Sequence, residues 1–237
     1  MIRCTLLIIA ISVFFAGVAG AHDLVGVIVP AYFDPGKLWD QMIADKKAHP
    51  GVPFCIIANP NSGPGEAPEA DYIRTIREAQ DAGITVLGYV HTSYGTRGTK
   101  AVDLEIARWE SWYKINGIFL DEMSSDPGHE AYYAALTHLL HKSHRLTIGN
   151  PGTTTSRSYY GTVDILMIHE SPGFADGAAS ELPAKDLASI SSSQPTINLP
   201  RLLAQKVSLV YSTDETDPPT YARLPKYFDQ LVAELDK

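Results

Sequence analysis

The feature that most constrains the fold of this chain is a recurring unit in which a short apolar strand is followed by a helix. Residues 26–33, 53–59 and 85–91 each form an apolar run that ends in polar or turn-forming residues. Between the second and third runs, residues 69–82 place apolar side chains at helical spacing before Gly83 ends the predicted helix. The first third of the chain therefore predicts alternating strands and helices.

The same unit continues toward the end of the chain, although it becomes shorter in the second half. We predict further helices at 102–115, 129–142, 199–205 and 224–235, and further strands at 117–120, 145–149, 164–169, 187–192 and 207–211. With the first three strands, eight strand units result.

The strands have continuous apolar runs, which are typical of parallel strands covered by helices. Eight such units close most naturally into a ring, so we predict an α/β fold with a single (β/α)8 TIM barrel, somewhat compressed in its second half. A doubly wound open sheet is the alternative. That fold usually carries a Gly-rich phosphate loop after its first strand, and residues 29–34 (Val-Pro-Ala-Tyr-Phe-Asp) form no such loop.

The first residues have the layout of a secretory signal peptide. Arg3 precedes an apolar run at 6–18, and three small residues follow that run. We predict a signal peptide at 1–21 and a barrel domain at 22–237, secreted to the extracellular space or a periplasm. The apolar run is shorter than the roughly 20 residues that a membrane span needs, and no later run reaches that length, so we expect no membrane span.

The charge of the chain limits its partners. The formal net charge of −8 becomes −9 when Arg3 leaves with the signal peptide. Because an acidic surface repels phosphate backbones, we expect no nucleic-acid partner. A neutral or cationic polysaccharide is compatible with this balance, and we expect the protein to be a monomer.

Polar and aromatic side chains stand where the predicted strands end. In a barrel of this type the functional groups lie on the face formed by the strand ends and the loops that follow them. The residues that we expect there are Tyr32, Asp34, Asn59, His91, Tyr94, Asp121, Glu122, Asn150, Glu170 and Asp214. Acids, amides and aromatic rings together suit the chemistry of sugars.

Three of these acids are candidates for cleavage of a glycosidic bond, which requires two carboxyl groups. Asp121 and Glu122 follow the buried run Gly-Ile-Phe-Leu, and Glu170 follows the apolar run at 165–169. Either of the paired acids could face Glu170 across the barrel mouth. The structural alternative is an acid pair at a helix N-terminus or in a salt bridge, with Glu170 as a lone structural acid.

Other chemistries have weaker support in the sequence. His138, His141 and His144 recur at helical spacing, but they fall on the predicted outer helix before the fifth strand, so we expect no metal site. Motifs of serine hydrolases, zinc proteases and nucleotide-binding enzymes are missing from the sequence, and we expect no cofactor.

Four blocks of sequence, in this order, resemble the spherulation-specific family 4 (spherulin 4) proteins. They are Val-Pro-Ala-Tyr-Phe-Asp-Pro with Trp39, Ile-Ala-Asn-Pro-Asn-Ser-Gly-Pro-Gly, Gly-Tyr-Val-His-Thr-Ser-Tyr-Gly-Thr-Arg, and Trp-Tyr-x-Ile-x-Gly-Ile-Phe-Leu-Asp-Glu. The second half aligns more loosely through residues 149–152, 169–172 and 211–214. The segment at 191–193 (Ser-Ser-Ser) departs from this pattern, since it offers few contacts where a strand should end.

The resemblance implies a glycoside hydrolase of family 135 type, a (β/α)8 barrel that acts as an endo-α-1,4-N-acetylgalactosaminidase on galactosaminogalactan. The family's acids fall on Asp121, Glu122 and Glu170. By analogy with related retaining enzymes, Asp121 is assigned as the nucleophile, Glu170 as the acid/base and Glu122 as a supporting acid. The alternative is a carbohydrate-binding or matrix protein that uses the same barrel without catalysis.

Overall fold

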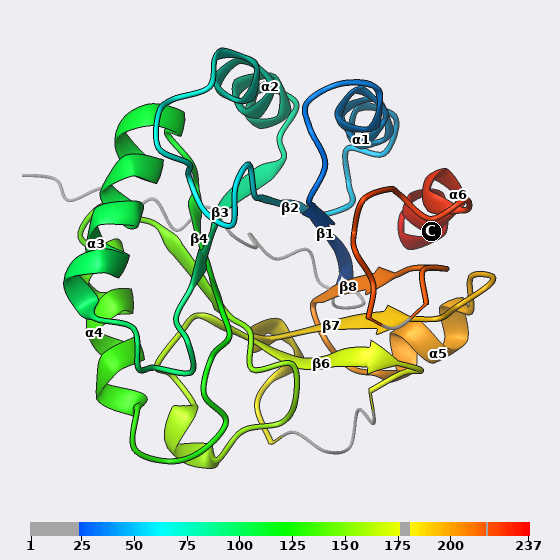
Figure 1. The fold of residues 1–237 in the computed structure, drawn as a ribbon. Coiled ribbons are helices and arrows are strands. Elements are labelled where there is room, and N and C mark those ends of the chain that lie inside the picture. Colours follow the sequence, from blue (N-terminus) through cyan, green and yellow to red (C-terminus); the bar gives the residue numbers. More distant parts are fainter. Residues whose placement is uncertain (1–23, 176–180, 217) are drawn as a thin grey trace, which may run out of the picture.

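Eight parallel strands close into one barrel in the computed structural model, which describes residues 24–175, 181–216 and 218–237 (Figure 1). Each strand pairs with its neighbours in chain order, and β1 pairs with β8 to complete the ring. The strands are β1 (Gly26–Ala31), β2 (Phe54–Ala58), β3 (Thr85–His91), β4 (Gly117–Asp121), β5 (Leu146–Gly149), β6 (Ile165–Pro172), β7 (Leu187–Ser192) and β8 (Leu209–Ser212). The predicted TIM barrel is confirmed, and the open sheet is excluded. The predicted signal peptide at 1–21 lies outside the described residues.

Helices surround the barrel and cover its strands (Figure 1). They are α1 (Lys37–Ala48), α2 (Ala70–Asp81), α3 (Thr99–Arg108), α4 (Glu130–His141), α5 (Leu199–Ala204) and α6 (Phe228–Leu235). The second half is compressed, as predicted, since 3-10 turns at Arg157–Tyr159 and Ala184–Asp186 precede β6 and β7 and α5 has only 6 residues. Among the helices that the structure describes, none is long and apolar enough to cross a membrane.

Two predicted helices have different bounds in the structure. The helix predicted at 102–115 is α3, which continues as a π-helical turn at Trp109–Tyr113. In that turn the Trp109 indole Nε1 donates to the carbonyl oxygen of Tyr89 at 2.9 Å, and its ring packs on Gly88, where an added Cβ would lie 2.5 Å from the ring. The π-turn therefore seats this buried tryptophan against β3.

The last helix begins at Phe228 rather than at 224. Pro225 explains the difference, because a proline disfavours helical geometry in the residue before it. The Phe228 N–H donates to the Pro225 carbonyl oxygen at 3.0 Å, so a turn precedes the helix.

The core is apolar and continuous between the barrel and its helices. All residues of β1, β2, β7 and β8 are buried, which accounts for the continuous apolar runs in the first two of these strands. Trp39 of α1, Trp109 and Phe228 are fully or almost fully buried between helices and strands. This packing fixes the strand ends, and with them the side chains at the barrel mouth.

Strand β6 contains one extra residue. Met167 pairs with Ala188 and Glu170 pairs with Ile190, so three steps along β6 match two steps along β7. An extra residue of this kind is a β-bulge, which reverses the alternation of side chains beyond it. Glu170 consequently shares a face of the sheet with Met167.

Candidate functional site

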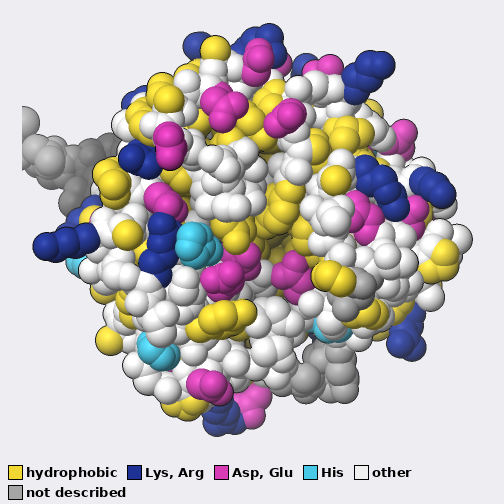
Figure 2. All heavy atoms as spheres, viewed as in Figure 1, with side chains coloured by type: hydrophobic (Ala, Val, Ile, Leu, Met, Phe, Trp, Pro, Cys, Tyr) yellow, Lys and Arg dark blue, Asp and Glu magenta, His cyan; other side chains and the backbone are white. Residues whose placement is uncertain are grey.

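The four polar residues predicted after the middle strands lie at one end of the barrel. Asp121 is the last residue of β4 and Glu122 follows it, Asn150 directly follows β5, and Glu170 lies within β6. Acidic and apolar side chains meet at a hollow near the centre of the face in Figure 2. Glu170 was predicted to follow its strand, whereas β6 continues to Pro172.

The Asn150 side chain joins two of the acids. Its Nδ2 donates to Asp121 Oδ1 at 2.8 Å and to Glu170 Oε2 at 2.5 Å. Because both oxygens bond the same nitrogen, these two distances limit their separation to at most 5.3 Å. Retaining glycosidases place their two carboxyl groups about 5–5.5 Å apart, and inverting enzymes place them farther apart.

Backbone contacts hold Asn150 rigidly between the strands. Its N–H donates to the Leu120 carbonyl oxygen and its own carbonyl oxygen accepts from the Met123 N–H, each at 2.9 Å. The side-chain Oδ1 accepts from the Gly152 N–H at 2.9 Å. With Oδ1 engaged in this way, the amide nitrogen of the buried side chain is directed at the two acids.

Glu122 has a left-handed backbone conformation, with φ of 49°. Its carbonyl oxygen accepts from the Tyr94 N–H at 2.7 Å and from the Thr92 hydroxyl at 2.8 Å. Left-handed geometry costs a non-glycine residue about 1–2 kcal/mol, so the turn after β3 helps to hold it. This turn of the backbone breaks the strand pattern directly after Asp121.

Three tyrosines surround the acid pair. The Tyr32 ring contacts the Tyr89 ring at 5.7 Å and the Tyr221 ring at 5.5 Å, both edge to face. The Tyr221 hydroxyl donates to Glu170 Oε1 at 2.6 Å, and the Tyr89 hydroxyl contacts Asp121. Burial, and then the nearby carboxylates, raise the pKa of each tyrosine well above its ordinary value. All three phenols therefore stay neutral at physiological pH.

The other predicted site residues have separate surroundings. His91 pairs with Asp121 across β3 and β4 and is half-buried, and Tyr94 is 62% exposed. The Asn59 Oδ1 accepts from the Gly63 N–H at 2.8 Å and so closes its own loop. Asp214 forms an ion pair with Arg223 at 2.5 Å. Asp34 is exposed, and its negative charge adds to the effect of burial in raising the pKa of Tyr72.

Tyr89 and Tyr221 were missed by the sequence reasoning. Tyr89 precedes His91 by two residues, so the alternation of strand side chains could have placed both on one face of β3. Tyr221 follows Pro-Pro-Thr in a loop after β8, where no periodic pattern relates it to the barrel. Its contact with Glu170 is visible only in three dimensions.

The histidines considered as metal ligands belong to the outer layer. His138 and His141 lie in α4, and His141 Nε2 contacts Asp164 Oδ1 at 2.9 Å. Within residues 24–175, 181–216 and 218–237, no group of three or more His, Cys, Asp or Glu side chains could hold a metal ion.

The protein is thus a TIM barrel of the kind that carries an acid pair at its mouth. The two carboxyl groups lie within hydrogen-bonding distance of one amide, and tyrosines surround them. A model of the family described as "Spherulation-specific family 4" matches residues 26–235. The chain therefore belongs to that family. Spherulin-4 of Physarum polycephalum is 35% identical over 159 residues, which are 65% of this chain and 47% of that protein. The chain thus spans about half the length of this curated relative.

Solved structures share the barrel. Aspergillus clavatus Sph3, crystallised in complex with GalNAc, superposes with a TM-score of 0.81 at 24% identity and covers 90% of this chain and 98% of its own. A chitinase from Chromobacterium violaceum superposes with a TM-score of 0.51 at 10% identity, over 71% of this chain and 68% of its own. These likenesses show that the chain shares the barrel fold of the two proteins.

Proposed function

We propose that this protein is a secreted glycoside hydrolase that cleaves an amino-sugar polysaccharide by a retaining, two-carboxylate mechanism. The observation that carries the proposal is the Asn150 amide, which bonds both Asp121 and Glu170 and keeps their bonded oxygens within 5.3 Å of each other. This spacing suits a nucleophile and an acid/base on either side of one glycosidic bond.

Two steps follow from this assignment. Glu170 gives its proton to the departing glycosidic oxygen while an Asp121 oxygen attacks the anomeric carbon, so that a glycosyl ester forms as the C–O bond breaks. Glu170 then takes a proton from water, the water oxygen attacks the same carbon, and the ester bond breaks. Glu122 supports the pair from beyond the strand end.

The surroundings of the acids suit a sugar ring. The Tyr32 and Tyr89 rings offer apolar surface for a pyranose face, and His91 and Asn59 offer polar groups for hydroxyls. Exposed Tyr94 follows β3, Asp214 follows β8 and Asp34 follows β1. We assign these residues to substrate binding.

The substrate that we propose is a galactosaminogalactan-like polymer, cut internally at α-1,4-linked N-acetylgalactosamine. Family membership and the GalNAc bound by the structurally similar Sph3 support this choice. The net charge of −8 also favours a neutral or cationic polymer over an acidic one. The signal-peptide pattern of the first 21 residues supports secretion.

The test is release of new reducing ends from partially deacetylated galactosaminogalactan and from other amino-sugar polymers by the protein lacking residues 1–21. We expect products with retained anomeric configuration, and losses of at least about 100-fold in Asp121→Asn and Glu170→Gln. Asp103→Asn, a change at an exposed acid of α3, is the matched control and should keep full turnover.

Two results would contradict the proposal. Wild-type turnover in Asp121→Asn or Glu170→Gln would remove the assigned roles. Binding of a polymer without release of product from any of them would identify a non-catalytic carbohydrate-binding protein instead.

A further inference from the structure

The loop after β8 delivers one tyrosine to the acid pair. Tyr221 is 5% exposed, and its hydroxyl donates to Glu170 Oε1 at 2.6 Å. The other carboxyl oxygen of Glu170, Oε2, accepts from Asn150 Nδ2 at 2.5 Å. Glu170 therefore receives a hydrogen bond on each oxygen, from two different segments of the chain.

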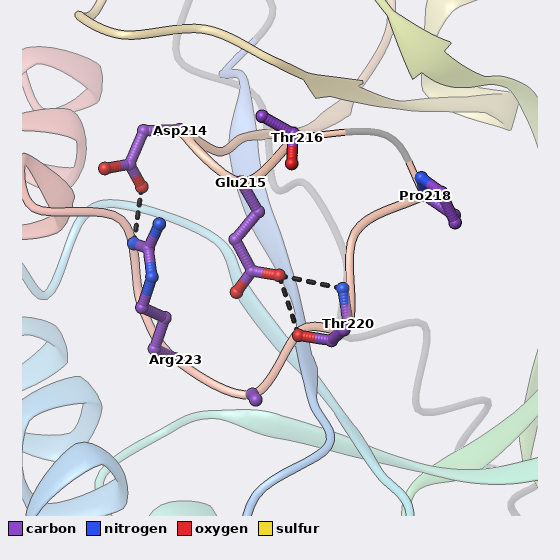
Figure 3. A pocket seen from close by; sticks show the side chains of 7 residues that line it. Asp214, Glu215, Thr216, Pro218, Thr220 and Arg223 are labelled. Atoms are coloured by element: carbon purple, nitrogen blue, oxygen red, sulfur yellow. Dashed lines mark hydrogen bonds and ion pairs between the residues drawn. The ribbon is translucent and has the colours of Figure 1, made fainter.

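A buried carboxylate shapes the loop that carries Tyr221. Glu215 is 8% exposed, and its Oε2 accepts from the Thr220 N–H at 2.8 Å, the Thr220 hydroxyl at 3.0 Å and the Tyr221 N–H at 3.0 Å. Figure 3 shows the Glu215 side chain reaching across the loop to Thr220. The Glu215 carbonyl oxygen accepts from the Ser193 N–H at 2.8 Å, which ties the loop to the end of β7.

Tyr221 needs this support because its backbone is left-handed, with φ of 53°. A residue other than glycine adopts this conformation at a cost and keeps it only where its surroundings impose it. The three bonds to Glu215 Oε2 and the edge-to-face contact with Tyr32 impose it here. These contacts thus offset the cost of the backbone conformation that positions the Tyr221 hydroxyl.

The phenol of Tyr221 acts as a donor over the whole working pH range. Burial, followed by the neighbouring Glu170 carboxylate, raises its pKa far above the ordinary value. Among the described residues, other titratable groups that face Glu170 include Asp121 of β4, Tyr89 of β3 and Tyr32 after β1. The two tyrosines are also held neutral, and Asp121 shares the Asn150 amide with Glu170.

We propose that Tyr221 is a positioning residue for Glu170 and that Glu215 holds it in place. This inference rests on the proposed function, in which Glu170 is the acid/base. The Tyr221 hydrogen bond fixes the rotation of the carboxyl group and favours its ionised form, opposing the repulsion from Asp121. Tyr221 thereby sets the pH at which Glu170 exchanges its proton with the glycosidic oxygen and with water.

The first test is the pH profile of kcat/KM on partially deacetylated galactosaminogalactan. Tyr221→Phe removes a donor to the ionised carboxyl, so the descending alkaline limb should move upward by about one pH unit. Glu215→Gln should move the same limb in the same direction by less, because a neutral amide is the weaker acceptor. Tyr211→Phe is the matched control, since the buried Tyr211 hydroxyl has no hydrogen-bond partner among the described residues and its ring lies 6.4 Å from the Tyr221 ring.

The second test does not depend on turnover. The carboxyl carbon of Glu170 is followed through a pH titration by NMR of protein with 13C-labelled glutamate, with the signal assigned from Glu170→Gln. Tyr221→Phe should raise the titration midpoint by about one pH unit, and Tyr211→Phe should leave it in place.

The two tests separate the inference from the proposed function. An unmoved midpoint in folded Tyr221→Phe would overturn the positioning role, whatever the activity. A moved midpoint in a protein that cleaves no polymer would support the hydrogen-bond role and overturn the hydrolase. A moved midpoint with a moved alkaline limb would support both.

Discussion

Replacement of Asn150 tests the electrostatic reasoning about the acid pair most directly. Asn150→Ala removes both side-chain N–H donors, whereas Asn150→Asp keeps the shape and replaces the donating amide with a third carboxyl group. The backbone of Asn150, which bonds Leu120 and Met123, is unchanged in either variant. The two variants are therefore matched in backbone and differ in charge.

The magnitude follows from the distances. Two unit charges 5.3 Å apart, the upper limit for the bonded oxygens, repel by about 3 kcal/mol at an effective dielectric constant of about 20. A hydrogen bond to a charged group contributes about 1.5–3 kcal/mol. Asn150→Ala should therefore reduce kcat/KM about 10- to 100-fold. Asn150→Asp should reduce kcat/KM further at pH 7, since it adds a negative charge beside Asp121 and Glu170.

The assays are reducing-end release and thermal unfolding, each at several pH values. At pH 7 we expect Tm to fall by several degrees in Asn150→Ala and farther in Asn150→Asp. Both losses of Tm should become smaller as the pH falls and the neighbouring carboxyl groups take up protons. Tm should rise more in Asn150→Asp than in Asn150→Ala. If Asn150→Asp matched Asn150→Ala in Tm and kcat/KM at pH 7, the electrostatic account of the pair would be wrong.

Three further predictions concern the mouth, the packing and the pH dependence of stability. Tyr94→Ala removes an exposed ring and should raise KM several-fold for long polymers, while KM for short oligosaccharides and Tm stay unchanged. An equal rise in KM for polymers and for oligosaccharides would contradict an extended binding surface. Gly88→Ala should lower Tm strongly, because the new Cβ would lie 2.5 Å from the buried Trp109 ring, whereas Gly98→Ala meets nothing within 4 Å and should have little effect. Burial raises the pKa of Asp45 from its ordinary value of 3.8 to about 6. Between these two pH values the folded protein keeps a proton that the unfolded chain releases, so the free energy of unfolding falls as the pH rises. Asp45→Asn should therefore raise Tm above pH 6 and leave it nearly unchanged below pH 4, and an unchanged Tm at pH 7 would refute this reasoning.

The barrel was predictable because several of its strands, such as β1 and β2, are fully buried and therefore stand out as apolar runs. The predicted seventh strand at 187–192 matches β7, and the acids after residues 117–120 lie at the mouth as expected. Parallel strands bring their carboxyl ends to one face whatever the loops contain. This rule predicted that Asp121, Asn150 and Glu170 would lie together.

The details of the site were less predictable because they depend on backbone geometry that has no periodic signal. The contact between Tyr221 and Glu170 joins residues 51 positions apart through a loop without regular structure. The ion pair of Asp214 with Arg223 likewise depends on the path of this loop, which no sequence pattern indicates. Pro225 was the one local signal that could have corrected the start of α6.

The bulge in β6 has an evolutionary consequence. If β6 kept its length but paired regularly with β7 from Met167 onward, Glu170 would lie opposite Ser191 and its carboxyl would turn toward the opposite face of the barrel wall. A homologue could thus retain every acid in its sequence and still lose the pair through substitutions that remove the bulge. The pairing of this strand, as much as residue identity, would then distinguish members that keep the acid pair from members that lose it.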